Sequence, residues 1–479
     1  MPPTACVLNL LLLAAPAAAT ATWSSTDDGR QSVDLSLSAW HAQQHLPPSE
    51  ESSGSGSAAT PEPPVVPATV PGDILAALER SDALGIRNES IYFASNLKSA
   101  SVQAAQNASY WLNTTAVTLS AAFAARGRHT LVVKGLDYNA TFYINGERIG
   151  SHAGPYRVGE LPIRNGLLTG GDGNEVAILF HMPPQGLIGG WLAPGNGVQG
   201  VMWNYLDWWK SMVGIGYDFG QPLWGIGVQE SLELVATDHA LISDLVALPE
   251  LQAPYEEALV NASVNVDSDV AMQAVVTWTV AQLPGQGEEQ QTTAAVAVAR
   301  TTVSLQVGRT HINSGAALKV QKPALWWPLG SGAQPLYTIS VAISAASSSA
   351  TTSGSGGALD SASRTFGIRD LKQVRNQGPE SWTYIEEFYC GPGEHAGAPP
   401  DGGANCTFPD ALTNLTAEQI DANRNWTFQV NGKKVFAHGA NWLPCDMRVS
   451  ECTTADYNYV LGAAADANMN FIRVWGTHY

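Results

Sequence analysis

The sequence contains five cysteines, whose thiols could form disulfides or bind a metal. Cys6 falls in the N-terminal apolar run, which leaves an even set of Cys390, Cys406, Cys445 and Cys452. No two of them have the Cys-x-x-Cys spacing of a metal site, so we expect no metal and favour oxidation. A disulfide between Cys390 and Cys406 would close a loop rich in Gly and Pro. Free, buried thiols are the alternative.

Asparagines in Asn-x-Ser/Thr sequons form a second reactive set, because they accept N-linked glycans in the secretory pathway. Eight occur, at Asn88, Asn107, Asn113, Asn139, Asn261, Asn405, Asn414 and Asn425. Residues 1–21 contain an apolar run followed by an Ala-Thr-Ala pattern that suits signal peptidase. We therefore expect a signal peptide and an extracellular, vacuolar or lysosome-like destination. An alanine-rich, unstructured N-terminus is the alternative.

An arginine and a tryptophan near the end of the sequence lie in a run that predicts a strand. Phe471–Trp475 is apolar except for Arg473, as expected of a parallel sheet covered by helices. Active sites of parallel barrels lie at the carboxyl ends of their strands, so Trp475 could stack there on a ligand ring. Arg473 is expected to point into the barrel and pair with a carboxylate. A core tryptophan and a structural ion pair are the alternatives.

The elements around this strand change the hydrophobic period from that of strands to that of a helix. Lys434–Ala437 predicts a short strand, and Thr453 with Asp456 three residues later predicts a capping box. The core-facing stripe of the helix would consist of Tyr457, Val460, Leu461 and Ala464. Strand, helix and strand in succession open an α/β barrel or a doubly wound sheet.

Upstream, short alternating runs separated by turn residues predict two β-sandwiches. Ala140–Ile149 is typical of a hairpin, because Asn145-Gly146 supplies the two positive-φ residues of a type I′ turn. Asn431-Gly432 predicts a second turn of this kind. We interpret Trp326 and Trp327 as core of the second sandwich.

The length of 479 residues exceeds what one core supports, so several domains are expected. Stretches rich in Ser, Gly, Ala and Pro favour linkers, since they cannot drive packing. The expected order is a signal peptide over 1–21, a flexible lead over 22–68, sandwiches over 69–235 and 236–370, a connector or insertion over 371–424, and an incomplete α/β barrel over 425–479.

The charge of the chain excludes one class of partner. Its net charge is -18 with 14% charged residues, whereas phosphate binding needs clustered Lys and Arg. Nucleic acid is therefore not expected as a partner. After the N-terminal run, no stretch is long and apolar enough to predict a membrane span. The sequence gives no indication of the oligomeric state.

Five strings, in order, carry a resemblance to a known family. They are Val70-Pro71-Gly72-Asp73, Gly216-Tyr217-Asp218-Phe219-Gly220, Leu325-Trp326-Trp327-Pro328, Gly439-Ala440-Asn441-Trp442 and Phe471-Ile472-Arg473-Val474-Trp475-Gly476. Together they resemble glycoside hydrolase family 2 in its β-mannosidase branch. The resemblance implies a mainly β, multidomain fold: a jelly-roll galactose-binding-like sandwich, an immunoglobulin-like sandwich and the first β/α units of a (β/α)8 barrel.

The resemblance also implies hydrolysis of β-mannosides of N-glycans or mannan fragments, with retention and no cofactor. Such chemistry needs two carboxyl groups about 5 Å apart. In the family both are glutamates that would follow Tyr479, so we expect no catalytic residue in this chain and no activity of the chain alone. Exo-β-glucosaminidases and endo-β-mannosidases share the strings. A non-catalytic carbohydrate-binding protein is the alternative from another class.

Two neighbouring residues of the first sandwich acquire a substrate-binding role through the resemblance. Asp218 corresponds to an aspartate that contacts the terminal sugar, where a carboxylate can accept hydrogen bonds from two hydroxyls. Tyr217 and Phe219 stand where the family has tryptophans, which changes the shape of this subsite. A turn role for Asp218 is the alternative.

At the barrel entry the resemblance implies four substrate-binding residues. Trp475 would stack on a pyranose, and Arg473 would pair with a catalytic carboxylate. Asn441 and Trp442 follow the strand predicted at Lys434–Ala437 and would line the rim of the site. Capping and turn roles are the alternative for Asn441 and Trp442.

Overall fold

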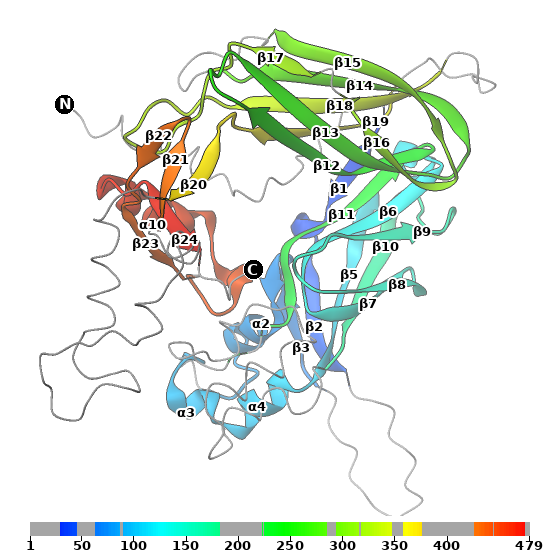
Figure 1. The fold of residues 1–479 in the computed structure, drawn as a ribbon. Coiled ribbons are helices and arrows are strands. Elements are labelled where there is room, and N and C mark those ends of the chain that lie inside the picture. Colours follow the sequence, from blue (N-terminus) through cyan, green and yellow to red (C-terminus); the bar gives the residue numbers. More distant parts are fainter. Residues whose placement is uncertain are drawn as a thin grey trace, which may run out of the picture.

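The structure is a computed structural model, and it describes two β-sandwiches followed by a small strand and helix unit (Figure 1). The described residues are 29–45, 63–86, 90–182, 223, 225–284, 294–315, 318–346, 358–375, 426–443 and 445–474. Among the helices of these segments, none combines the length and apolar character needed to cross a bilayer.

The first sandwich consists of two antiparallel sheets with the core between them. One sheet has the order β1 (Gln31–Asp34), β11 (Gly227–Thr237), β6 (Arg128–Asp137) and β9 (Gly159–Ile163), and β4 (Gly72–Asp73) also pairs with β11. The other has the order β3 (Val65–Ala68), β2 (Trp40–His45), β5 (Ser109–Leu119), β10 (Gly171–Phe180), β7 (Asn139–Ile144) and β8 (Glu147–Ala153). Short helices η1 (Leu35–Leu37), α2 (Ile74–Arg80), α3 (Ala94–Leu97), α4 (Ala100–Gln106) and α5 (Ala121–Ala124) connect the strands.

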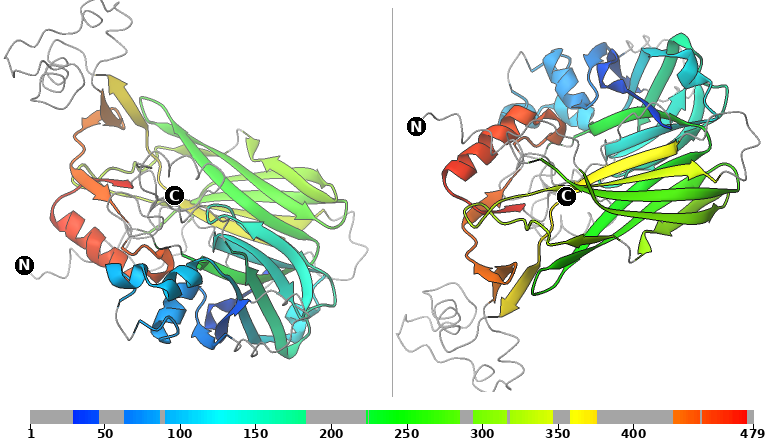
Figure 2. Two further views of the ribbon diagram at one scale, coloured as in Figure 1. Left: turned by 90° about the horizontal axis from the view of Figure 1, so that it is seen from below. Right: turned by 90° about the horizontal axis from the view of Figure 1, so that it is seen from above.

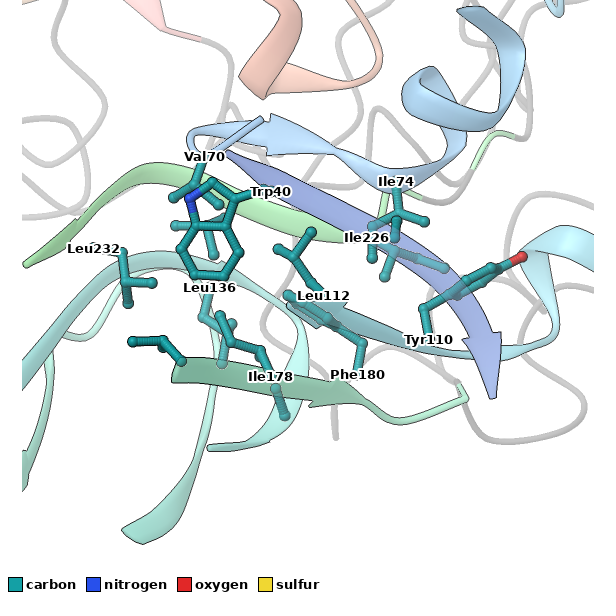
Figure 3. Packing of buried hydrophobic residues seen from close by; sticks show 14 of the residues in the cluster. Trp40, Val70, Ile74, Tyr110, Leu112, Leu136, Ile178, Phe180, Ile226 and Leu232 are labelled. Carbon is teal, nitrogen blue, oxygen red and sulfur yellow. The ribbon is translucent and has the colours of Figure 1, made fainter. Parts of the chain in front are cut away.

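Large apolar side chains from both sheets meet in this core (Figure 3). Trp40 and Tyr110 are almost fully buried, and both satisfy their polar atoms through backbone acceptors. The Trp40 indole donates to the Leu35 carbonyl at 2.9 Å, and the Tyr110 hydroxyl donates to the Ala105 carbonyl at 2.8 Å. The core therefore carries no uncompensated polar group at either ring.

The flexible lead predicted over 22–68 is wrong where the structure describes it. β1, β2 and β3 all lie in this range and belong to the first sandwich. Trp40 and Ala42 alternate inward from β2, and Val66 does so from β3. One or two inward side chains hold such short strands, because neighbouring strands supply the hydrogen bonds and the rest of the core. Residues 46–62 lie outside the described residues.

The second sandwich has the same architecture with a different strand order. Its sheets are β12 (Ala240–Leu251), β13 (Glu257–Ser268) and β16 (Gly308–Asn313), with β17 (Lys319–Gln321) on β13, and β15 (Ala295–Leu305), β14 (Met272–Gln282), β18 (Tyr337–Ala345) and β19 (Ala358–Phe366). Val276, Trp278 and Val280 are fully buried at every second position of β14. The prediction of two sandwiches from alternating apolar residues is therefore confirmed.

Trp326 and Trp327 are not core residues of this sandwich, which corrects their interpretation. Both are half-buried. The Arg369 guanidinium lies 4.5 Å from the centroid of the Trp326 ring, and the Lys433 ammonium lies 5.1 Å from that of Trp327. Each indole thus packs under a cation at the boundary with the C-terminal unit.

The C-terminal unit holds two small sheets and one longer helix. The first sheet has the order β20 (Leu371–Arg375), β21 (Trp426–Val430) and β22 (Lys433–Val435), and the second pairs β23 (Gly439–Trp442) with β24 (Phe471–Val474) in parallel. Helices η5 (Val449–Glu451) and α10 (Thr454–Asp466) connect β23 to β24. The predicted strand, helix and strand order is confirmed, and so is the capping box of Thr453 and Asp456.

Two details of this unit differ from the prediction. The first parallel strand is β23 and not Lys434–Ala437, because the Asn431-Gly432 turn, with φ of 46° and 79°, folds Lys433–Val435 back onto β21. The predicted core-facing stripe of α10 is not buried, and Val460 is 37% exposed. Only two parallel strands are described beside this helix, so they cannot cover it.

Candidate functional site

Asn441 and Arg473 meet across the parallel strand pair. They are direct partners in the register of β23 and β24, and the Arg473 guanidinium donates to the Asn441 Oδ1 at 3.1 Å. Both side chains are exposed, so the guanidinium keeps donors for a further acceptor. Carboxyl ends of parallel strands are where α/β barrels place their sites, and two of the predicted residues come together there.

Trp442 lies apart from this pair. Successive side chains of a strand point to opposite faces, so Trp442 faces away from Asn441. Its ring stacks on Tyr457 of α10, with centroids 5.7 Å apart and an interplanar angle of 18°. The role of Trp442 at the rim of the site stays a prediction; the structure corrects only its position, since Asn441 and Trp442 lie on β23 itself and not after it.

Other predicted residues lie outside the described residues. These are Tyr217, Asp218, Trp475, Cys390, Cys406, Asn88, Asn405, Asn414 and Asn425, with the predicted signal peptide over 1–21. Among the described sequons, Asn107 is exposed, while Asn113, Asn139 and Asn261 are half-buried. A disulfide joins Cys445 to Cys452 across seven positions of sequence. The pair closes the loop that follows β23. This pairing was not predicted, although the short separation of the two cysteines could have indicated it.

Arg448 lies inside this disulfide-closed loop and reaches the first sandwich. Its side chain is 8% exposed, and its guanidinium donates to the Glu79 Oε2 at 2.6 Å. It also lies 5.1 Å from the centroid of the Tyr92 ring and 3.5 Å from the Asp446 Oδ1. One arginine therefore joins the loop to α2 and to the segment before α3.

Tyr92 and Asp446 complete this contact. The Tyr92 hydroxyl donates to the Asp446 Oδ1, which also accepts from the Arg448 backbone N at 2.8 Å. Burial, together with the bond to Asp446, raises the pKa of Tyr92, so this hydroxyl stays protonated and remains a donor. Sequence reasoning missed Tyr92, Glu79 and Arg448, since partners so distant in sequence leave no periodic pattern.

Asp73 lies beside the same contact and is 5% exposed. Its Oδ1 caps α2 by accepting from the Ala76 N at 2.9 Å, and its Oδ2 accepts from the Ile226 N at 2.7 Å. Burial raises its pKa to about 6, although the charge of Arg448 acts in the opposite direction. Asp73 thus ties α2 to the residue that precedes β11.

Comparison with known families matches both sandwiches. Residues 40–227 match the galactose-binding domain-like domain of glycosyl hydrolase 2, and residues 240–369 match glycosyl hydrolases family 2. The chain is similar to β-mannosidase A of Emericella nidulans, 23% identical over 72% of this chain and 33% of that protein. It is also similar to mannosylglycoprotein endo-β-mannosidase of Lilium longiflorum, 23% identical over 72% of this chain and 30% of that protein.

A solved structure has the same fold. The β-D-mannosidase of Dictyoglomus thermophilum aligns with a TM-score of 0.64 at 18% identity and covers 94% of this chain, which covers 44% of that structure. The chain thus spans less than half the length of these relatives. Two domains of one family follow each other over both sandwiches, and the chain therefore belongs to glycosyl hydrolase family 2.

Proposed function

We propose that the chain is the front part of a retaining β-mannosidase-type glycosidase that cleaves β-mannosides of N-glycans or mannan fragments. The observation that carries the proposal is the pairing of Asn441 with Arg473 at the ends of two parallel strands, in the part of the chain that follows the two family domains. The β-mannosidase relatives support the choice of sugar.

In this proposal the chain supplies one wall of the site and positions groups for the reaction. Retaining hydrolysis requires an acid/base carboxyl and a nucleophilic carboxylate about 5 Å apart, and we place both beyond Tyr479. The Arg473 guanidinium offers a planar fork of N–H donors, which can hold a carboxylate in its ionised form. Asn441 occupies one guanidinium donor and orients the rest.

Asp218 and Trp475 would complete the sugar contacts. The Asp218 carboxylate would accept hydrogen bonds from hydroxyls of the terminal sugar, with Tyr217 beside it. The Trp475 indole would stack on the apolar face of the same ring. We place the protein in the secretory pathway, on the basis of its N-terminal run and its sequons, and expect a glycan at the exposed Asn107.

The test is turnover by the full-length enzyme and by residues 1–479, purified side by side. We expect the full-length enzyme to hydrolyse an aryl β-mannoside, with the β-anomer of mannose as the first product seen by NMR. Residues 1–479 should show no turnover, because we place both carboxyls beyond Tyr479.

Three results would contradict the proposal. Faster turnover of an aryl β-glucosaminide would identify a glucosaminidase. The α-anomer as first product would exclude retention. Sugar binding without turnover by the full-length enzyme would indicate a carbohydrate-binding protein. An Asp218→Asn variant tests the role of Asp218 in sugar binding. We expect kcat/KM to fall about tenfold, because one charge-assisted hydrogen bond to the sugar is lost.

A further inference from the structure

The proposed site needs the first sandwich and the first barrel strands to be held in a fixed relation. Sugar would bind between them, and misplacement of a positioned group by about 1 Å can lower a rate about a hundredfold. The described contacts between these two parts converge on the loop after β23. In both views of Figure 2 this red segment lies beside the blue segment that contains α2, and η5 contacts β4 and β11.

We propose that Arg448 is a positioning residue that holds β23, and with it Asn441 and Arg473, in a fixed position relative to the first sandwich. The proposal rests on the proposed function, in which the sugar binds between these two parts. Arg448 lies six residues after Trp442 at the end of β23, inside the loop that the Cys445–Cys452 disulfide closes. The closed ring limits the conformations of this loop, so a contact made by Arg448 is transmitted to the strand.

The surroundings of Arg448 are built for a single orientation of its guanidinium. Glu79 accepts from one end at 2.6 Å, the guanidinium carbon lies over the Tyr92 ring at 5.1 Å from its centroid, and Asp446 faces the Nε. Tyr92 in turn fixes Asp446 by donating to it. Lysine cannot present a planar fork to Glu79 and Asp446 while its charge lies over the Tyr92 ring, so we expect the geometry to require arginine.

Asp73 extends this contact into the framework of the sandwich. It lies close enough for the charge of Arg448 to act on it, and it binds the backbone N of both Ala76 and Ile226. Arg448 is therefore connected, through Glu79 and Asp73, to the helix α2 and to the residue that precedes β11. A substitution at Arg448 should therefore loosen the backbone at Ile226 as well as at β23.

The same junction offers a matched control. Arg80 of α2 pairs with Glu451 at 2.7 Å, but its side chain is 51% exposed, so this ion pair should contribute little. Arg448 and Arg80 thus link neighbouring residues of α2 to the same loop, and they differ in burial.

The experiment compares Arg448→Ala, Arg448→Lys and Arg80→Ala in the full-length enzyme with an aryl β-mannoside. We expect kcat/KM to fall at least tenfold for Arg448→Ala, mainly through kcat, with only partial recovery for Arg448→Lys. Arg80→Ala should stay within twofold of the wild type. A charge-swapped Glu79→Arg/Arg448→Glu variant should lose activity like Arg448→Ala, because the Tyr92 and Asp446 contacts are not restored.

Amide hydrogen exchange of residues 1–479 tests the same inference without activity. Arg448→Ala should speed exchange at 225–228 and 439–443 at least tenfold and leave β14 and β18 unchanged. Unchanged exchange at both segments, or full kcat/KM in Arg448→Lys, would overturn the proposal. Uniformly faster exchange would also overturn it, as the sign of a general stability role. Absence of turnover by the wild-type enzyme would contradict the proposed function, while the exchange result would still decide the role of Arg448.

Discussion

Two buried arginines lie where the first sandwich meets its two neighbours, and they are held in different ways. Arg30, just before β1, donates to the Asp360 Oδ2 of the second sandwich at 2.8 Å, and these side chains are 2% and 0% exposed. Arg448, in the loop after β23, contacts Glu79 and Tyr92 of the first sandwich and Asp446 of its own loop. Its side chain is 8% exposed.

The difference lies in what surrounds each arginine. Asp360 also accepts from the Ile242 N at 2.6 Å. The carboxylate of the first junction is therefore bound both by Arg30 and by the backbone of its own sandwich, and we call this buried ion pair the closed pair. Burial raises the pKa of Asp360 against the opposing charge of Arg30. The second junction lies on a loop, beside a helix without a buried residue. The comparison indicates that the first junction serves stability, whereas the second serves the relative placement of two parts.

The largest expected effect is at the closed pair. Arg30→Met should lower the free energy of unfolding by about 3–5 kcal/mol, because it leaves Asp360 buried without its partner. Urea unfolding of residues 1–479 measures the loss. The double variant Arg30→Met/Asp360→Leu should recover most of it, since no charge then remains buried. A loss below about 1 kcal/mol in the single variant would mean that water reaches this junction.

A smaller, pH-dependent effect is expected at Asp73. The pKa of Asp73 is raised from 3.8 to about 6, so the folded state binds this proton more tightly than the unfolded state. The resulting stabilisation is present below about pH 4 and is lost as the pH rises through about 6.

Comparison with Asp73→Asn measures this effect. The excess stability of the wild type over the variant should shrink between about pH 4 and about pH 7 by about 2–3 kcal/mol, at about 1.4 kcal/mol for each pKa unit. Denaturant unfolding at both pH values provides the measurement. A pH-independent difference would show that Asp73 keeps an ordinary pKa.

The smallest effect is expected at an exposed arginine of the first junction. Arg309 of β16 pairs with Glu160 of the first sandwich at 2.9 Å and with Asp267 at 2.8 Å, but it is 51% exposed. Arg309→Ala should therefore lower the free energy of unfolding by less than about 1 kcal/mol. A loss as large as that of Arg30→Met would break the distinction between closed and exposed pairs.

Much of the fold could be predicted from local patterns. The alternating apolar residues of β14 and the Asn145-Gly146 turn could be interpreted from residues that are neighbours in the sequence. The failures have a physical reason as well. Residues 22–68 were predicted to be flexible because part of this range is rich in Ser, Gly, Ala and Pro, and only the pairing of β2 with β5 places its short strands in a sheet. The first parallel strand was misplaced because the start of β23 depends on how the preceding hairpin folds.

The sequence by itself determined the succession of two sandwiches and a strand and helix unit, together with the capping box at Thr453 and the residue types that meet at β23 and β24. Only the tertiary structure decided which charges meet. Arg30 and Asp360 lie 330 positions apart, and Arg448 and Glu79 lie 369 apart. Capping and alternation act over a few residues and leave a pattern in the sequence. An ion pair between distant segments leaves none, because packing alone brings its partners together.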